Sequence, residues 1–528
     1  MLGISEKYHA LAALVSLPSL ALGTSHDIAK PATGYPPCDA LISAGLGDRV
    51  ILPTSDAYEP RVQSFWYGNG RLRPWCFLQP HTAEEVSTAV TALHNGGHGE
   101  EDWNIAVRSG GHGPPGTNNI ANGVTIDLGM MNSAQYDPGT GLARVEPGAA
   151  WKDIYFDLLD QGNVTAIGGR DGDVGVGGFL LGGGMSYYTP NEGFSCDQVV
   201  NFEVVLSNGT ITNANSHQNP DLWRALKGGG FNFGIVTAFD LLTLPAIDLA
   251  YGQSIVSQNY SDAVLDAVVE FTNHPQDLSD DALIPCYSHD PSLTPLDPTS
   301  DYTILLIRTN AAANLDTQSF ENVTKIPTLT PPTWNLTSHA KAANDSQVPA
   351  GTLNSQRTLT LPNCPETLRK AASLHHDFVK HLSNTLPGGS SSFETRMFLQ
   401  PLPHYIHAHS VQKGGNMLNL DPEGENLILF VAGVSIIDDT DEASFAIAAT
   451  EMGYMVSEIE AFALAEGGDS DSDSELGFVY MNYADPSQDP IATYGDENVA
   501  FMKGVAKEVD PSGFWERSVP GGFKLGRD

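Results

Sequence analysis

Apolar side chains recur with helical spacing in two segments of the first third of the chain. In HTAEEVSTAVTALHNGG, residues 81–97, Thr82 can cap a helix, Glu85 completes a capping box and Gly96 ends it. A second segment, WKDIYFDLLDQG at residues 151–162, has the same period. The pattern predicts two amphipathic helices, with buried faces made of Val86, Ala89, Val90 and Leu93 in the first and Trp151, Ile154, Tyr155, Leu158 and Leu159 in the second.

Around these helices, shorter runs show the composition of β-strands. NIAVR at residues 104–108 predicts a short strand, and GVTIDLGMMN at residues 123–132 predicts another, with Val124, Ile126 and Leu128 on one face. FEVVLSNGTITNA at residues 202–214 is typical of a hairpin around Asn208 and Gly209. Helices and strands therefore alternate from about residue 74 to residue 245, which predicts an α+β region with a mixed sheet.

The pattern is weaker from about residue 247 to residue 466, where proline-rich joints separate strand-like pieces such as YTILLI and NLILFVAGVS. We expect a second domain here. The acidic run EGGDSDSDSE, residues 466–475, has an Asp spacing that resembles a calcium loop but lacks the rest of an EF-hand. A solvated linker is the better interpretation.

Composition is that of an ordinary globular protein. The chain has 528 residues, 41% of them hydrophobic, which is enough for two or three domains. Its 26 basic and 63 acidic residues give a formal net charge of −37. Because such a field repels polyanions, we expect no nucleic-acid partner and no stable membrane association.

The N-terminal residues predict a secretory signal peptide, residues 1–23. The apolar run ALAALVSLPSLALG is too short to span a bilayer and ends in small residues. Because Lys7 is offset by Glu6, a membrane anchor or an internal helix remains an alternative. Secretion would allow disulfides among the five cysteines, and glycosylation at the sequons of Asn163, Asn208, Asn259, Asn322, Asn335 and Asn344.

Two glycine-rich stretches need a physical reason. They are VRSGGHGPPG, residues 107–116, and IGGRDGDVGVGGFLLGGGMS, residues 167–186, which holds nine glycines. Glycine is costly in an apolar sequence unless the backbone needs a positive φ or approaches a ligand closely. Free N–H groups in such turns bind anions, yet neither stretch matches a Walker loop or a Rossmann unit. The spacing alone therefore indicates a phosphate-bearing cofactor and no more.

Four stretches, in order, carry a resemblance to a known family. They resemble the vanillyl-alcohol oxidase superfamily of FAD enzymes with a PCMH-type domain, and within it the berberine-bridge-enzyme-like group; the ending SVPGGFKL resembles fungal members associated with specialised metabolism. The stretches begin RSGGHGPPG, GGRDGDVGVGG, NPDLWRALKGGG and YMNYADPSQDP. The resemblance implies an α+β fold made of a two-part FAD-binding domain at 30–246, a substrate domain at 247–466 with an antiparallel sheet covered by helices, an acidic linker at 467–475 and a segment at 476–528 that returns to the FAD domain.

The resemblance also implies how the flavin is held. In this family the histidine of the Ser-Gly-Gly-His turn bonds to the flavin 8α-methyl group, so His112 is the expected covalent attachment. Many members have a second, cysteinyl bond, but Asp171 occupies that position here. Val174 lies where the family admits or excludes dioxygen, and its small side chain resembles that of the oxidases. The other expected cofactor-binding residues are Arg108, Ser109, Gly110, Gly111, Gly113, Gly175, Gly177, Gly178, Gly183 and Val236.

Hydride transfer from an alcohol requires a base to take the hydroxyl proton. Tyr483 in YMNYAD matches the catalytic tyrosine of several relatives, Tyr480 is the fallback, and Asn482 is expected to support the ring by hydrogen bonding. A buried phenol beside a cationic partner can act as a base, although aromatic residues in a strand-like piece are more often core. The adjacent His375 and His376 project in different directions, so we expect no metal site.

The resemblance pairs Cys38 with Cys76 in a disulfide that ties the N-terminal helix to the flavin domain. Cys196 is expected to be a buried free thiol, which leaves Cys286 and Cys364 as a possible pair.

The predicted function is that of a secreted FAD-dependent oxidase. It would pass hydride from a small organic molecule, such as an intermediate of specialised metabolism, to the flavin, with O2 as acceptor and H2O2 as product. Alcohol oxidation, dehydrogenation and oxidative cyclisation remain open. An oligosaccharide oxidase is the first alternative, and a non-redox cyclase or dehydratase with structural FAD is the second.

Overall fold

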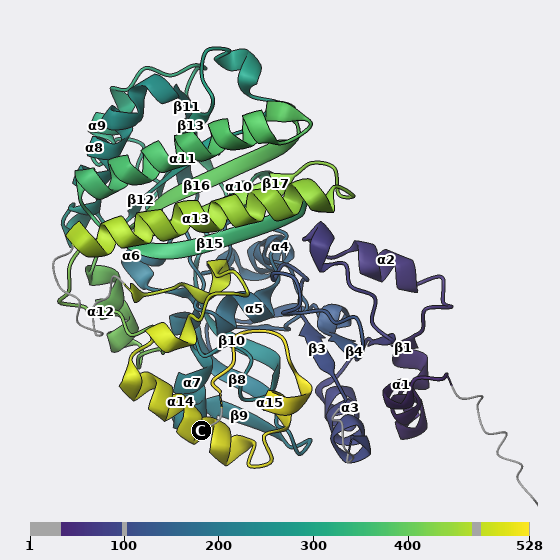
Figure 1. The fold of residues 1–528 in the computed structure, drawn as a ribbon. Coiled ribbons are helices and arrows are strands. Elements are labelled where there is room, and N and C mark those ends of the chain that lie inside the picture. Colours follow the sequence, from purple (N-terminus) through teal and green to yellow (C-terminus); the bar gives the residue numbers. More distant parts are fainter. Residues whose placement is uncertain (1–32, 98–102, 467–476, 527–528) are drawn as a thin grey trace, which may run out of the picture.

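A computed structural model describes residues 33–97, 103–466 and 477–526. The predicted signal peptide and acidic linker lie outside these residues. Three sheets make up the described part (Figure 1). The helices are α1 (Pro36–Leu41), α2 (Tyr58–Gln63), α3 (Ala83–Gly96), α4 (Trp151–Gly162), α5 (Val176–Leu181), α6 (Thr189–Glu192), α7 (Pro220–Leu226), α8 (Ser261–Thr272), α9 (Glu321–Thr324), α10 (His339–Asp345), α11 (Pro365–Thr385), α12 (Tyr405–Gln412), α13 (Glu442–Glu466), α14 (Asp496–Val509) and α15 (Phe514–Ser518).

The first sheet is mixed, as predicted. Its strand order is β1-β2-β4-β3, with β1 antiparallel to β2 and the other pairs parallel. Val124, Ile126 and Leu128 are all buried, and the residues between them in β4, Thr125 and Asp127, are buried as well. Central strands of parallel pairs are covered on both faces. The strands are β1 (Val50–Ile51), β2 (Cys76–Leu78), β3 (Ile105–Arg108) and β4 (Val124–Asp127).

Helix α3 packs beside this sheet and begins as predicted. The Thr82 side chain accepts the Glu85 N–H at 3.3 Å. The reciprocal half of the capping box differs, since the Glu85 carboxylate accepts from the His81 N–H at 2.7 Å and pairs with Arg49. Both contacts fix the start of the helix.

The second sheet is antiparallel and contains the predicted hairpin. Its order is β5-β6-β10-β8-β9, with β7 also paired to β10. The hairpin turns at Asn208 and Gly209 between β8 and β9. The strands are β5 (Ala134–Asp137), β6 (Leu142–Val145), β7 (Val164–Ala166), β8 (Val199–Val205), β9 (Ile211–Asn215) and β10 (Ile235–Pro245).

The third sheet takes all its strands from the middle of the chain, and every neighbouring pair is antiparallel. The order is β14-β11-β13-β12-β16-β17-β15. The predicted strand-like pieces YTILLI and NLILFVAGVS fall on β13 and β17. The strands are β11 (Leu249–Ser257), β12 (Asp281–His289), β13 (Thr303–Asn310), β14 (Asn335–Thr337), β15 (Leu353–Pro362), β16 (Phe393–Leu402) and β17 (Leu427–Ile436).

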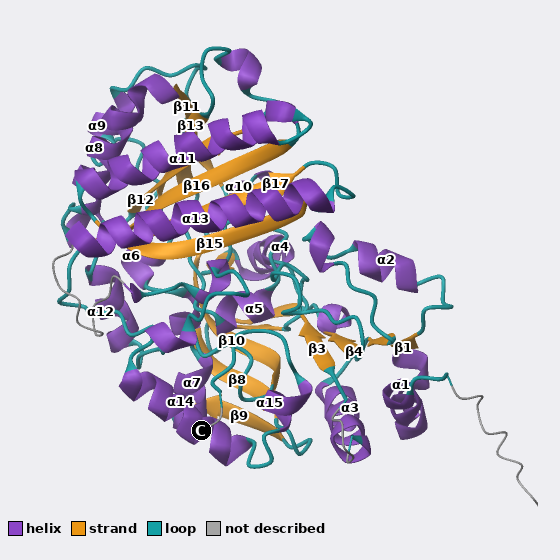
Figure 2. Cartoon of the chain, viewed as in Figure 1, coloured by secondary structure: helices purple, strands orange, loops and turns teal. Residues whose placement is uncertain are grey.

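Alternation along these strands gives the sheet two buried faces. Leu283, Leu306 and Met397 join α8, α11 and α13 in one core, and the two long helices cross this face in Figure 2. Their neighbours in sequence, Ile284, Ile307 and Phe398, pack in another cluster with Ile167, Tyr187 and Tyr188, which belong to or follow the second glycine-rich stretch. The sheet is therefore a platform with helices on one side and glycine-rich backbone on the other.

The C-terminal segment returns to the first half of the chain. Phe514 and Trp515 of α15 lie in the core of the first sheet, and Asn232 donates a hydrogen bond to the Phe523 carbonyl at 3.0 Å. The stretch around YMNYAD is not a strand as expected: Met481–Tyr483 is a single 3₁₀ turn. Side chains three positions apart lie on the same side of such a turn, which matters for the site below.

Cys38 and Cys76 form the predicted disulfide, joining α1 to β2. The possible pair Cys286 and Cys364 is wrong, since both are free, as is the buried Cys196. Cys286 lies on β12 two positions after Ile284, and so on the sheet face opposite to the helices. Cys364 lies at the start of α11, on the helix side, and accepts the Thr367 N–H.

Candidate active site

The two glycine-rich stretches lie directly against each other. A Cβ on Gly110 would come 2.7 Å from the Cα of Gly175, and a Cβ on Gly175 would overlap the backbone nitrogen of Gly110. Ser109 links the stretches as well, because its hydroxyl donates to the Pro147 carbonyl at 2.5 Å and accepts from the Gly177 N–H at 3.1 Å. The glycines are thus required by contact of backbone with backbone.

The first turn presents unused backbone donors. Within the described residues, the N–H groups of residues 110–113 donate to no protein acceptor. Gly111 has a φ of +81°, and a Cβ on Gly178 would meet nothing within 4 Å. Consecutive N–H groups in such a turn form an anion-binding nest. The turn fits a diphosphate, and the open side of Gly178 leaves space beside it.

His112 lies at the end of this nest and stacks on Trp66. Their ring centroids are 4.7 Å apart with an interplanar angle of 28°. Burial lowers the pKa of His112 to about 4, so the imidazole is neutral at ordinary pH, with a ring nitrogen free to react. Trp66 was not predicted from the sequence. Its indole N–H donates to the Val348 carbonyl at 2.9 Å, which fixes the ring that supports His112.

Arg108 and Val236, both expected to bind the cofactor, are buried among protein groups. Arg108 is buried and donates to the carbonyls of Arg61 at 3.2 Å and Ser64 at 2.9 Å, with its guanidinium 3.9 Å from the Phe65 ring centroid. Burial lowers its pKa to about 10. Val236 is buried in β10 within the main core. Both side chains have protein partners, and their expected contact with the cofactor stays a prediction.

Asp171, at the position of the family's cysteinyl bond, is engaged by backbone. Its carboxylate accepts from the N–H groups of Asp173 at 2.9 Å and Val348 at 3.1 Å. Burial raises its pKa. Val174 is half-buried, and its carbonyl accepts from the Trp151 N–H at 3.1 Å. Hydrogen bonds to Trp151 and Val348, and one within the loop, therefore hold residues 168–175 in place.

The hydroxyl of Tyr483 has a cationic partner. Arg170, in the second glycine-rich stretch, donates to Tyr483 Oη at 2.7 Å and to Gln400 Oε1 of β16 at 2.7 Å. A guanidinium that donates to a phenol oxygen stabilises the negative charge left when the proton departs. This three-residue network joins the glycine-rich stretch, the third sheet and the C-terminal turn. Sequence reasoning named Tyr483 but missed Arg170 and Gln400.

Tyr480, the fallback candidate for the base, lies in different surroundings. Its ring is buried, and its hydroxyl accepts from the Gly184 N–H at 2.7 Å and from Asn482 Nδ2 at 3.1 Å. Burial raises the pKa of Tyr480 well above its usual value, which makes proton loss unfavourable. Asn482 also donates to the Phe179 carbonyl at 2.9 Å and leaves no room for a Cβ on Gly182. Tyr480 and Asn482 therefore hold the C-terminal turn against the glycine-rich stretch, close to Gly183.

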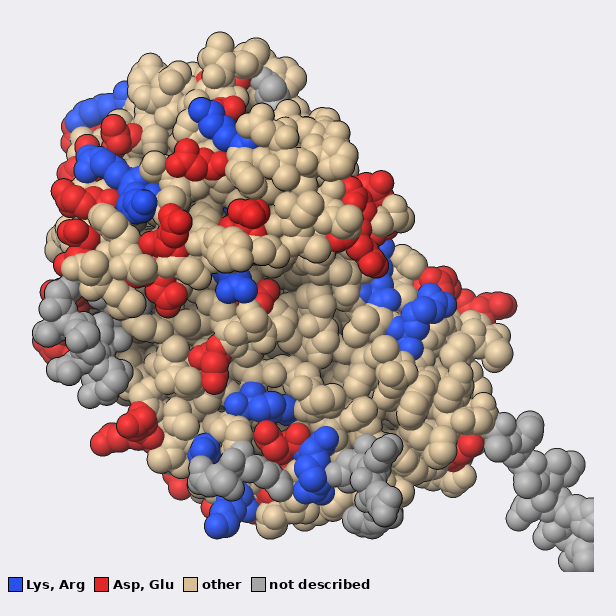
Figure 3. Space-filling view, viewed as in Figure 1, with Lys and Arg blue, Asp and Glu red and all other residues tan. Residues whose placement is uncertain are grey.

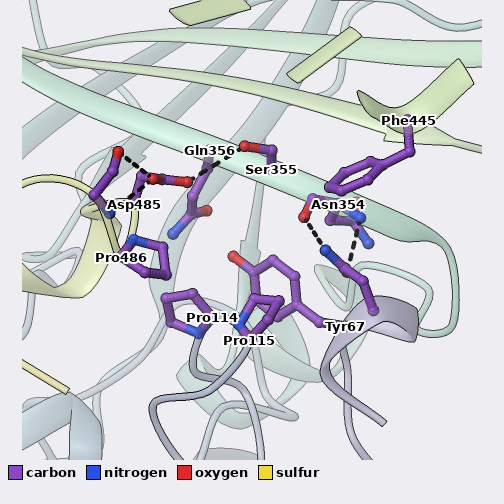
Figure 4. A pocket seen from close by; sticks show the side chains of 11 residues that line it. Tyr67, Pro114, Pro115, Asn354, Ser355, Gln356, Phe445, Asp485 and Pro486 are labelled. Carbon is purple, nitrogen blue, oxygen red and sulfur yellow. Dashed lines mark hydrogen bonds between the residues drawn. The ribbon is translucent and has the colours of Figure 1, made fainter. Parts of the chain in front are cut away.

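A cavity of about 450 Å³ opens beside the histidine turn (Figure 4). Pro114 and Pro115 of that turn form one wall, and β15 and the loop after Tyr483 form the opposite side. This volume suits one small organic molecule. The lining residues are Tyr67, Asn69, Pro114, Pro115, Asn354, Ser355, Gln356, Phe445, Asp485, Pro486 and Ser487.

Among the described residues, no group of three or more His, Cys, Asp or Glu side chains is placed to hold a metal ion. His375 and His376 have separate partners, Thr395 at 2.9 Å and Asp301 at 2.7 Å. No helix in the described ranges is long and apolar enough to cross a membrane. On the face shown in Figure 3, acidic and basic side chains are scattered among uncharged ones.

The contact between the glycine stretches predicts unequal effects of two single-methyl substitutions. Gly175→Ala should lower the free energy of unfolding by about 1–3 kcal/mol or more, because the new methyl group meets the backbone of Gly110. Gly178→Ala, the matched control, adds the same methyl group where nothing lies within 4 Å and should be close to wild type in the absence of ligand. Urea denaturation measures both. Equal stability of the two variants would contradict this packing.

The chain is similar in sequence to known FAD-dependent proteins. Residues 74–215 match the model of the FAD binding domain family. The FAD-dependent monooxygenase drtC of Aspergillus calidoustus is 31% identical over 93% of this chain and 90% of its own length. The FAD-dependent monooxygenase sdcF of Emericella nidulans is 32% identical over 93% of this chain and 98% of its own length.

A solved structure shows the same fold. The structure of glucooligosaccharide oxidase from Acremonium strictum, described with a 6-S-cysteinyl, 8α-N1-histidyl FAD, has a TM-score of 0.71 at 18% identity and covers 92% of this chain and 100% of that one. With two relatives above 30% identity along nearly their whole length, the chain belongs to the same family of FAD-linked oxidoreductases as these two fungal proteins.

Proposed function

We propose that this chain is a secreted oxidase that removes two electrons and two protons from a small organic substrate and delivers them to O2. FAD, when bound, supplies the acceptor for the hydride. The substrate hydroxyl proton goes to Tyr483, and O2 leaves with two electrons and two protons as H2O2. The observation that carries the proposal is the Arg170 to Tyr483 hydrogen bond of 2.7 Å.

The residues present fit FAD. The free N–H groups of residues 110–113 suit the diphosphate, and the neutral His112 ring suits a covalent bond to the flavin. The FAD of the glucooligosaccharide oxidase has both a cysteinyl and a histidyl link. Because residue 171 is an aspartate bound to backbone N–H groups, this chain would make only the histidyl link.

Tyr483 would act as the base because Arg170 donates a hydrogen bond to its hydroxyl oxygen. Arg170 is itself held by Gln400, so its guanidinium is fixed before the substrate binds. A fixed cation would stabilise the phenolate, which is the form in which Tyr483 can take the substrate hydroxyl proton. The cavity lining includes Asp485, two residues after Tyr483, which supports a base near the proposed substrate space.

Secretion is supported by the Cys38–Cys76 disulfide, which is typical of oxidising compartments, and by the apolar N-terminal run.

A monooxygenase is the second candidate function, because two of the relatives are named monooxygenases. An oligosaccharide oxidase is favoured only by the name of a structural neighbour, and a non-redox role for FAD has no observation in its favour.

Substitution of the base should slow flavin reduction. We expect Tyr483→Phe to retain flavin and fold normally but to reduce its flavin with substrate about 10²–10⁴-fold more slowly, because proton removal loses its acceptor. Anaerobic stopped-flow with a substrate found by an oxygen-uptake screen measures the rate. Tyr480→Phe, which removes the same hydroxyl from the neighbouring ring, is the matched control and should lose stability rather than rate. A Tyr483→Phe rate equal to wild type would move the base elsewhere.

The covalent link can be mapped directly. After acid denaturation and digestion of the wild-type protein, the flavin mass should remain on the peptide that contains His112 and be absent from the peptide that contains Asp171. His112→Ala should release all flavin into the supernatant. Covalent flavin in that variant would overturn the assignment, as would complete release from the wild type.

The fate of oxygen separates the candidate functions. For an oxidase, each substrate molecule consumed should give one H2O2, and no label from ¹⁸O2 should enter the product. A monooxygenase would incorporate one labelled atom and leave little peroxide. Turnover without oxygen uptake would instead support the cyclase or dehydratase alternative and contradict the oxidase.

A further inference from the structure

The cavity holds two polar groups that nothing in the described part of the chain uses. The Tyr67 side chain is only 2% exposed, and its hydroxyl has no hydrogen-bond partner there. The side-chain amide of Gln356 on β15 has none either. Figure 4 shows both directed toward the same space above Pro114. Both groups line the cavity and have no hydrogen-bond partner in the described residues, so both are available to a ligand.

The rest of the lining is apolar or already satisfied. Pro114, Pro115, Phe445 and Pro486 give flat hydrocarbon surfaces. Asn354, by contrast, donates to Thr352 and accepts from Ser435. A ligand therefore finds extended apolar walls and few free hydrogen-bonding groups, an arrangement that suits a ring system with a single polar end.

The charges of the lining residues indicate the charge of the ligand. Asp485 is the one acidic lining residue, and none of the lining residues is a lysine or arginine. The Asp485 carboxylate accepts from the Ser487 N–H and hydroxyl, and Arg357 lies 3.9 Å away. Burial raises the pKa of Tyr67, so its hydroxyl keeps its proton and can donate. An anionic ligand would thus lie beside a carboxylate with no lining cation to compensate it.

Ring contacts connect the cavity to the flavin attachment. Tyr67 packs edge-on against Trp66 with centroids 4.8 Å apart, and Trp66 stacks on His112 at 4.7 Å. A group held by Tyr67 is therefore separated from His112 by one indole ring. The polar end of the ligand would therefore lie close to the residue expected to hold the flavin.

Resting on the oxidase proposal, we propose that the substrate is a neutral, flat ring compound with one hydroxyl or carbonyl oxygen held by Tyr67 and Gln356. Tyr67 and the Gln356 amide both donate to lone pairs of that oxygen, so the proton of a hydroxyl stays available to Tyr483. A sugar is a poor fit, because its several hydroxyls would meet proline and phenylalanine surfaces and remain unpaired.

Direct binding to the oxidised holoenzyme tests this without turnover. Isothermal titration under anaerobic conditions would use 2-naphthol, its carboxylate counterpart 2-naphthoate, and cellobiose as probes. We expect 2-naphthol to bind, 2-naphthoate to bind at least tenfold more weakly, and cellobiose to give no measurable binding. No binding of 2-naphthol at millimolar concentration, equal binding of naphthoate, or tighter binding of cellobiose would each overturn the proposal.

Variants test the two polar groups separately. Tyr67→Phe and Gln356→Leu should each weaken 2-naphthol binding about tenfold, because each leaves the ligand oxygen with one partner fewer. Tyr260→Phe, on the surface and 39% exposed, is the matched control and should bind as wild type does. Flavin content and melting temperature show whether each variant is folded; if Tyr67→Phe is not, Gln356→Leu still decides. Wild-type affinity in a folded variant would overturn that residue's role.

Failure of the ligand proposal can be told apart from failure of the oxidase proposal. If the probes bind as expected but the holoenzyme yields no peroxide with any substrate, the ligand assignment stands and the reaction assignment fails. If peroxide forms with cellobiose while 2-naphthol does not bind, the reaction assignment stands and the ligand assignment fails.

Discussion

The site depends on the contact between two backbones at Gly110 and Gly175. A side chain at either position would separate the turns, because the Cβ of each would meet the main chain of the other. Their closeness lets Ser109 bond across to Gly177 and leaves the N–H groups of residues 110–113 without protein acceptors in the described part of the chain. The same constraint that excludes side chains thus creates the anion site, so packing and binding cannot be changed independently.

The third sheet gives this glycine-rich backbone a rigid cover. Alternation along β12, β13 and β16 sends one set of side chains to the helices and the other to Ile167, Tyr187 and Tyr188. Gln400 of β16 holds Arg170, and Gln356 of β15 lines the cavity. Polar groups on strands are held more precisely than on loops, and both amides are therefore fixed relative to the turns.

The sequence predicted the features that depend on residues close together in the chain. Motif order identified the family, and glycine density marked both turns, because backbone contact demands glycine wherever it occurs. It could not reveal Trp66 behind His112 or Arg170 beside Tyr483, since Arg170 and Tyr483 are 313 positions apart and no local pattern links them. Nor could it reveal the protein partners of Arg108, which are the ring of Phe65 and the carbonyls of Arg61 and Ser64.

Tyr480 and Tyr483 show how burial divides roles between neighbouring rings. A strand would place them on opposite faces, whereas the 3₁₀ turn brings their ring centroids to 4.9 Å. Tyr480 has a backbone donor and no cation, and burial makes its ionisation unfavourable, so it can only hold the turn. Tyr483 is half-buried, and its oxygen faces a guanidinium that a second residue fixes. A guanidinium that donates to a phenol oxygen stabilises negative charge on it, so of the two rings Tyr483 has the surroundings that the proposed base requires.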